Sequence, residues 1–198
     1  MNPAIIIVDL LEGNLGFIKA GNKEDERIKI IPRVRDFLKS CRSLSIPVIF
    51  ACDSFLKDDF IFLGRMKPQA IRGTRDTRPL AELEPAKTDI VLEKRRFSAF
   101  FKTDLDQTLR TMNIDTVVVG GINTEFCVLA TAIDAICNDF YTIILEDLSA
   151  SHKKEIHSNF LAAYRKSALY PLFRVMDSAE FLNEFKNDTD RGKRPQIG

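Results

Sequence analysis

The sequence predicts an α/β protein of three layers, in which helices cover both faces of an open parallel sheet. Short apolar runs recur along the chain, and they are continuous rather than alternating, which is typical of strands buried on both faces. Helical stretches separate these runs, and such alternation indicates βαβ units. The expected strands are Ile5–Val8, Val48–Ala51, Ile90–Leu92, Thr116–Val119 and Thr142–Leu145.

The helices are predicted from apolar residues that recur every three or four positions. The first carries such residues from Ile28 to Cys41, and Pro32 either kinks it or marks a late start. The second is expected over about 104–112, the third from Thr124 onward and the fourth over about 153–166. A short last helix follows Asp177 or Ser178, either of which suits an N-cap.

Length and charge predict one domain, over residues 1–186, followed by a polar tail over 187–198. The chain has 29 Lys and Arg against 28 Asp and Glu, and this net charge gives no global attraction for nucleic acid or an anionic membrane. Asp9 interrupts the N-terminal apolar run, which has no basic leader, so neither a signal peptide nor a membrane span is expected. We therefore expect a cytoplasmic protein whose partner is a small molecule.

Cysteine and histidine usage predicts no metal and no other cofactor. The four cysteines lack CxxC spacing, and two histidines are too few for an ordinary zinc site. Reduced thiols are expected, three of them as small buried residues. The cysteines are Cys41, Cys52, Cys127 and Cys137.

Polar residues directly follow four of the expected strands, namely Asp9, Asp53, Lys94 and the segment 123–127, which ends at Cys127. The carboxyl ends of parallel strands meet at one edge of a sheet, where sites gather. A carboxylate, an ammonium and a thiol are then expected to share one crevice, and together they suit nucleophilic catalysis. Each has an ordinary alternative: Cys127 as a packing residue, Asp9 as a turn cap and Lys94 as part of a solvated basic cluster.

Cys127 stands in GGINTEFC, which predicts a strand, a glycine turn and the start of a helix. The partial positive charge at the start of a helix and its unpaired backbone donors both favour a thiolate at Cys127. The unpaired backbone donors of the same turn could also receive a developing oxyanion.

The connection from Cys52 to Thr88 has no periodicity and is long for a compact domain, so it is expected to form a wall or lid of the pocket. Aromatic residues could line the pocket or belong to the core, and Arg65, Arg72 or Arg75 could hold a substrate carboxylate or be solvated. His152 and His157 are expected at the surface. The expected substrate-binding residues are Phe17, Asp53, Arg72, Phe97, Phe100 and Thr124.

The chain contains the stretches AIIIVDLL, IPVIFACDS, RGT at 72–74, DIVLEKRRFSAFFKTDLDQTLR and VVVGGINTEFCVLATAIDA, of which the last two in tandem are the most specific. In these stretches, from about Ala4 to Asp177, the sequence resembles the isochorismatase-like cysteine hydrolases, which include nicotinamidases and N-carbamoylsarcosine amidases. The resemblance implies a Rossmann-like sheet of about six parallel strands and a catalytic triad of Asp9, Lys94 and Cys127. It also implies a cis peptide at Ile122–Asn123, with backbone donors of Asn123 and Cys127 forming an oxyanion hole.

The implied activity is hydrolysis of a C–N bond in a small carbamoyl, ureido or carboxamide compound through a thioester, by a homo-oligomer (dimer or tetramer). The zinc-binding members carry two histidines where this chain has Phe55 and the Pro68–Ala70 stretch, and Leu11 replaces a family glutamine, so neither zinc nor nicotinamide is favoured. The alternatives are vinyl ether hydrolysis, as in isochorismatases, and a catalytically idle binding module. A flavodoxin-like nucleotide-binding module would lack its phosphate-binding motif here.

Overall fold

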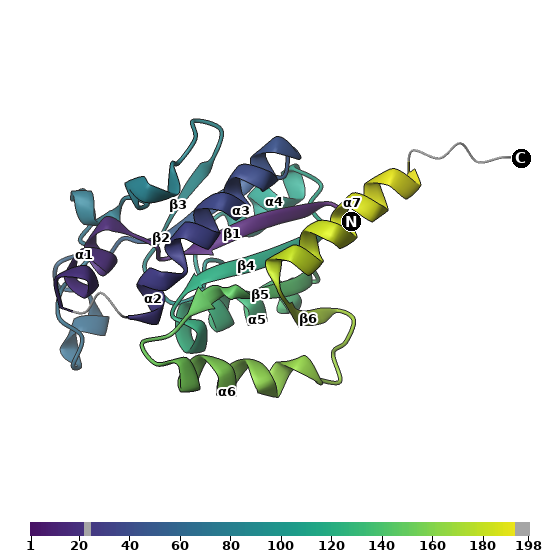
Figure 1. Cartoon of the computed structure of the whole chain (residues 1–198). Coiled ribbons are helices and arrows are strands. Elements are labelled where there is room, and N and C mark those ends of the chain that lie inside the picture. Colours follow the sequence, from purple (N-terminus) through teal and green to yellow (C-terminus); the bar gives the residue numbers. More distant parts are fainter. Residues whose placement is uncertain (22–24, 193–198) are drawn as a thin grey trace, which may run out of the picture.

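The computed structural model describes residues 1–21 and 25–192, without the side chains of 17–21 and 190–192. Its described part contains a parallel sheet of six strands in the order β3-β2-β1-β4-β5-β6, which confirms the predicted fold class (Figure 1). The four-residue β6 has only two buried residues, which explains why the sequence pattern did not reveal it. The strands are β1 (Pro3–Val8), β2 (Val48–Asp53), β3 (Ile90–Lys94), β4 (Thr116–Ile122), β5 (Tyr141–Ala150) and β6 (Phe173–Met176).

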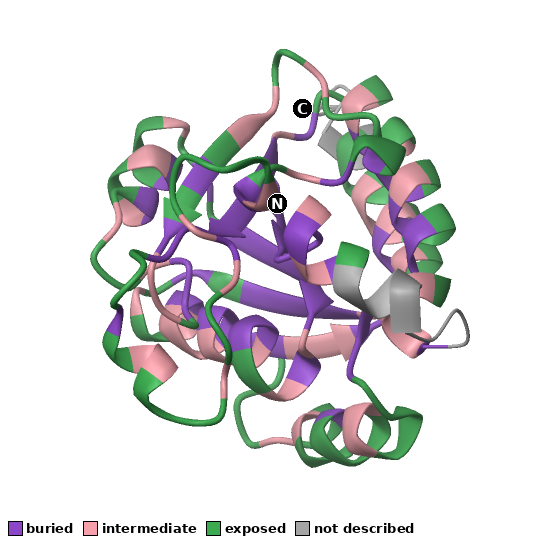
Figure 2. Cartoon of the chain, turned by 90° about the vertical axis from the view of Figure 1, so that its left-hand side faces the viewer, coloured by how far each residue is buried: buried purple, intermediate pink, exposed green. Residues whose placement is uncertain are grey.

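Helices cover both faces of the sheet, so the molecule has the three predicted layers. On one face lie α3 (Ile31–Ser43) and α7 (Ser178–Gly192), and a buried apolar cluster joins them to the strands. On the other face lie α4 (Leu105–Thr111), α5 (Leu129–Cys137) and α6 (Lys154–Arg165), over a second cluster. Figure 2 shows the buried strands between helices that expose their outer faces.

Helix α3 begins at Ile31, so of the two predicted alternatives, a kink at Pro32 or a late start, the late start is confirmed. A separate short helix, α2 (Glu26–Lys29), precedes α3, and Pro32 lies in the first turn of α3. Proline is tolerated there because its missing N–H would have no helical partner. Asp25 caps α2, since its side chain accepts a hydrogen bond from the backbone N–H of Arg27.

Two helices differ from the sequence-based expectation. Helix α1 (Glu12–Gly21) was not predicted, because its three glycines weaken the helical pattern. Helix α7 is longer than expected, so residues 187–192 of the predicted tail are helical. Residues 193–198 of that tail lie outside the described residues. No helix in the described part of the chain is both long and apolar enough to cross a bilayer.

The long connection between β2 and β3 folds over the carboxyl ends of the strands. It contains three short 3₁₀ helices, Phe60–Leu63, Arg75–Thr77 and Ala81–Leu83. Asp59 fixes its first part, because this buried carboxylate accepts hydrogen bonds from Arg95 at 2.6 Å and from Arg96 at 3.3 Å. The connection is thereby held against the residues that follow β3.

Candidate active site

The candidate site lies where β1 and β4 run side by side at the centre of the sheet. The chain leaves β1 toward β2 and leaves β4 toward β5, so the connections diverge and open a crevice at the strand ends. Gly121 of β4 pairs with Val8 of β1 and has a φ of +119°. A Cβ at position 121 would lie 2.1 Å from the carbonyl oxygen of Val8, so only glycine fits this approach.

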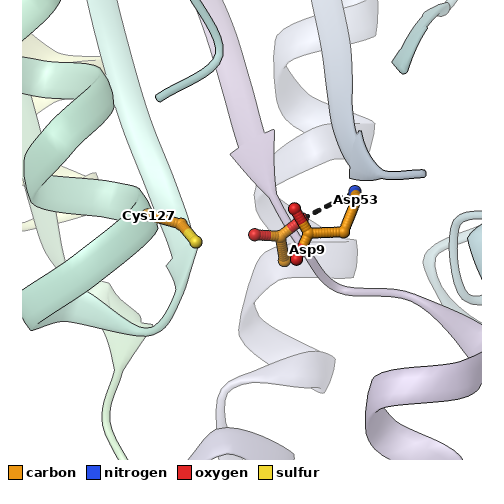
Figure 3. A group of neighbouring side chains, drawn as sticks. All are labelled: Asp9, Asp53 and Cys127. Atoms are coloured by element: carbon orange, nitrogen blue, oxygen red, sulfur yellow. Dashed lines mark hydrogen bonds between the residues drawn. The ribbon is translucent and has the colours of Figure 1, made fainter. Parts of the chain in front are cut away.

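Three charged side chains meet at the ends of β1, β2 and β3. The ammonium of Lys94 donates hydrogen bonds to Asp9 Oδ2 at 2.8 Å and to Asp53 Oδ1 at 2.5 Å. It also donates to the carbonyl oxygen of Arg96 at 3.2 Å. The second oxygen of Asp9 accepts a hydrogen bond from the backbone N–H of Asp53 at 2.9 Å (Figure 3). The Lys94 side chain is fully buried, and the two carboxylates are nearly so.

Cys127 approaches this group from the opposite side of the crevice. Its Sγ and one carboxylate oxygen from each of Asp9 and Asp53 all lie within 4.8 Å of one another. Figure 3 shows the thiol pointing from its helix toward Asp9. The helix begins as a π-helical turn, Thr124–Val128, and continues as α5, so the predicted start near Thr124 is confirmed. We call Asp9, Asp53, Lys94 and Cys127 the polar cluster.

Burial and charge shift the pKa values of the polar cluster. Burial, the charge of Asp9 and a hydrogen bond to Asp9 raise the pKa of the Cys127 thiol well above its ordinary value. This direction is opposite to the effect expected of the helix terminus, because burial and the neighbouring carboxylates disfavour the thiolate. Burial and the charge of Asp9 raise the pKa of Asp53 to about 7. Burial opposes the charge of Lys94, but the two carboxylates outweigh it and raise the pKa of Lys94.

A cavity of about 450 Å³ opens above the polar cluster. Asp9, Asp53 and Cys127 line its base, whereas Lys94 lies behind the two carboxylates. The β2–β3 connection supplies much of the remaining lining, which confirms its prediction as a wall of the pocket. We use the name wall for seven lining residues outside the polar cluster, namely Phe55, Ile61, Arg65, Met66, Gln69, Phe97 and Phe126.

Several predicted pocket residues are in place. Ile122 and Asn123 line the cavity, and the peptide bond between them is cis, as the resemblance implied. Phe97 and Asp53 also line it. The side chain of Phe17 lies outside the described residues.

Three predicted pocket residues lie elsewhere. Phe100 packs against Phe140, with ring centroids 6.0 Å apart, because it belongs to the cluster under α4 and α5. Arg72 donates to Ser54 Oγ at 3.1 Å and pairs with Glu93 at 3.2 Å, outside the cavity lining. Thr124 is buried and its hydroxyl contacts His157 Nδ1 at 2.8 Å, so it turns toward α6 instead of the pocket.

Two predictions about exposure also need correction. His157 is not a surface residue: it is partly buried against Thr124, and this burial lowers the pKa of its imidazole. Cys137 was expected among the buried thiols but is exposed, because it ends α5. Cys41 and Cys52 are buried as expected, and all four cysteines are free.

Outside the β2–β3 connection, sequence reasoning missed three residues that line the cavity, namely Asn14, Arg27 and Phe126. Asn14 belongs to the unpredicted helix α1, and Arg27 belongs to the short α2. Neither helix has a sequence pattern strong enough to place its side chains. Phe126 precedes the predicted nucleophile by one residue, and that proximity was the one available signal.

The donor atoms of Asp9, Asp53 and Cys127 are close enough to suggest a metal site, but the residues do not fit one. The ammonium of Lys94 already binds both carboxylates. The positions where zinc-binding members carry histidines hold the buried Phe55 and the stretch around Gln69. Lys94 therefore supplies the positive charge at this site.

Fold and site define an α/β protein that presents a thiol beside a carboxylate and a buried ammonium at the switch point of a parallel sheet. The Isochorismatase domain matches residues 3–179. The chain belongs to the isochorismatase family and is a hydrolase of that family.

Relatives cover most of the chain. An uncharacterized isochorismatase family protein, YecD of Escherichia coli O157:H7, is 29% identical over 91% of this chain and 94% of its own length. Ureidoacrylate amidohydrolase RutB of Pantoea ananatis is 29% identical over 76% of this chain and 69% of its own length. The crystal structure of N-carbamoylsarcosine amidase from Thermoplasma acidophilum has a TM-score of 0.73 and 28% identity, covering 90% of this chain and 97% of that one.

Proposed function

We propose that this chain cleaves a C–N bond of a small carbamoyl, ureido or carboxamide compound through a thioester on Cys127. It is an enzyme of the amidohydrolase type, acting on C–N bonds other than peptide bonds, like its named relatives. The observation that supports this proposal most directly is that the Cys127 thiol lies within 4.8 Å of the Asp9 carboxylate, at the base of a cavity. A nucleophile next to a proton acceptor is the arrangement that acyl transfer requires.

In the first half of the proposed reaction, Asp9 takes the thiol proton while Sγ bonds to the substrate carbonyl carbon. Because the pKa of the thiol is raised, we propose that proton removal accompanies the attack. Backbone N–H groups of Asn123 and Cys127 donate to the oxyanion. Collapse of this intermediate breaks the C–N bond, and Asp9 returns the proton to the leaving ammonia or amine.

In the second half, Asp9 takes a proton from water, which attacks the thioester carbonyl. The C–S bond breaks, the product acid or carbamate leaves, and the proton returns to Sγ. Lys94 holds the Asp9 carboxylate in place throughout, through the 2.8 Å hydrogen bond to Oδ2. Asp53 shares that ammonium and so fixes its position.

The test is an ammonia-release assay on carbamoyl, ureido and carboxamide compounds, combined with acid quenching and mass spectrometry of the Cys127 peptide. We expect turnover of at least one compound, a trapped acyl group on Cys127, and loss of both in Cys127→Ala and Asp9→Asn. Cys137→Ala is the matched control, because that thiol is exposed and its loss leaves the cavity unchanged. Turnover that survives in Cys127→Ala would refute the thioester, and isochorismate cleavage by that variant would favour the vinyl ether alternative.

A further inference from the structure

Residues 123–128, which we call the nucleophile turn, carry Cys127 and the backbone groups proposed to receive the oxyanion. Asn123 and Cys127 line the active-site cavity, whereas Thr124 and Glu125 do not. The side chains of Thr124 and Glu125 are instead hydrogen-bonded to α6 and to the segment just before it. The nucleophile turn therefore faces the cavity on one side and contacts the start of α6 on the other.

We propose that His157 of α6 is a positioning residue, which fixes the nucleophile turn through its hydrogen bond to Thr124. The inference rests on the proposed function, because it assigns a further residue to the same reaction. The hydrogen bond joins His157 Nδ1 to the hydroxyl of Thr124 at 2.8 Å. Thr124 is only 1% exposed, so water would not readily replace His157 as the partner of this hydroxyl.

The imidazole of His157 is uncharged at pH 8, because its pKa lies below the ordinary value. Burial is the main cause, and Lys154 acts in the same direction, whereas Glu125 and Glu26 oppose the shift. A neutral imidazole has one nitrogen that donates and one that accepts, and a hydroxyl can do either. The contact with Thr124 is therefore satisfied in both tautomers of His157.

A second hydrogen bond holds the same side of the nucleophile turn. The hydroxyl of the fully buried Ser151 donates to the carboxylate of Glu125, whose side chain is 7% exposed. Ser151 and His157 also line a separate cavity of about 420 Å³, behind the turn. Side chains beside a cavity lack close packing on that side, so directed hydrogen bonds carry more of the positioning.

The position of the nucleophile turn matters most in the transition state. Negative charge develops on the substrate oxygen only as Sγ of Cys127 bonds to the carbonyl carbon, and the donors have to be aligned at that moment. A turn released from His157 would present its thiol and its N–H groups less accurately, while the rest of the cavity would still bind the substrate. We therefore expect kcat to fall and KM to change little.

The test measures ammonia release at pH 8 in variants that remove or restore the hydrogen bond. His157→Leu and Thr124→Val should each lower kcat by about tenfold and leave KM within about twofold. The double variant should fall no further than either single variant, because both remove the same contact. His157→Asn should restore kcat to within about threefold of the wild type, since its amide can place a polar atom near the position of Nδ1.

Asn159→Leu is the matched control, because it also introduces leucine into α6, at an exposed position. The proposal is overturned if His157→Leu keeps its kcat, if His157→Asn is no better than His157→Leu, or if Asn159→Leu acts like His157→Leu. If His157→Leu does not fold, the nearly isosteric Thr124→Val decides the outcome by the same measure.

Hydrogen exchange separates this inference from the proposed function, because it needs no turnover. If the wild type releases no ammonia from any compound, the proposed function fails, and exchange in a peptide that covers 123–128 decides whether His157 fixes the turn. Exchange should be faster in His157→Leu and Thr124→Val than in the wild type and His157→Asn. Equal exchange in all four proteins would overturn the inference.

Discussion

The polar cluster and the wall bound the same cavity but are built in opposite ways. In the cluster, Lys94, Asp9 and Asp53 are buried at strand ends and satisfy one another through short hydrogen bonds. In the wall, most side chains come from the β2–β3 connection or from the residues after β3, and Phe126 comes from the helix of Cys127. Phe97 and Phe126 remain 45% and 52% exposed. Rigid strand ends therefore hold the groups proposed for the chemistry, whereas connections, which can change without disturbing the sheet, are proposed to select the substrate.

Removing the cation of the cluster should have the largest effect. In Lys94→Met, two buried carboxylates lose their shared partner, and we expect the free energy of unfolding to fall by about 3–5 kcal/mol at pH 8. The loss should be smaller at pH 5, where a proton can replace the lost charge. Urea unfolding at both pH values measures it, with the exposed Lys87→Met as control. Equal losses at the two pH values would contradict this account of the cluster.

The second prediction concerns the backbone approach that places the cluster beside Cys127. A methyl group at position 121 would overlap the carbonyl oxygen of Val8, and its φ of +119° is strained for alanine. Gly121→Ala should therefore lose at least about 3 kcal/mol of unfolding free energy. In contrast, Gly16→Ala in α1 should be neutral or stabilising, because its Cβ would meet nothing within 4 Å. Thermal and urea unfolding of both variants would show whether the two glycines really differ.

The same contrast explains what could be predicted from sequence. Strand ends follow from apolar runs, and parallel topology then brings Asp9, Asp53, Lys94 and Cys127 to one edge. The direction of the Thr124 side chain could not be predicted, because the π-helical turn rotates this side chain toward His157.

Asn14 and Arg27 could not be predicted either. Their helices are glycine-rich or only one turn long, so no periodicity indicates which side chains face the cavity. The raised pKa of the Cys127 thiol could not be predicted, because helix position can be read from sequence but the extent of burial cannot.

The third prediction uses pH to test the charge balance of the polar cluster against an exposed carboxylate outside it. The pKa of Asp53 is about 7 in the folded protein and lies near its ordinary lower value after unfolding. A raised folded-state pKa means that Asp53 contributes stability at low pH, which is lost as the pH rises from about 4 through 7. Relative to the wild type, Asp53→Asn should therefore gain stability from pH 5 to pH 8, on the order of 1 kcal/mol. The exposed Asp58→Asn should show no such trend in urea unfolding.

Changes in the wall should have the smallest effect on stability and act on substrate binding. The rings of Phe97 and Phe126 lie 5.7 Å apart, and both line the cavity. Because both are about half exposed, Phe126→Ala should cost less than about 1 kcal/mol of stability. It should raise KM by several-fold and leave kcat within about twofold, since the lost contact is made equally in the ground state and the transition state. Phe101→Ala, equally exposed but outside this cavity, should change neither constant. A large fall in kcat for Phe126→Ala would instead mean that the wall helps to position Cys127, and the division between chemistry and selection would not hold.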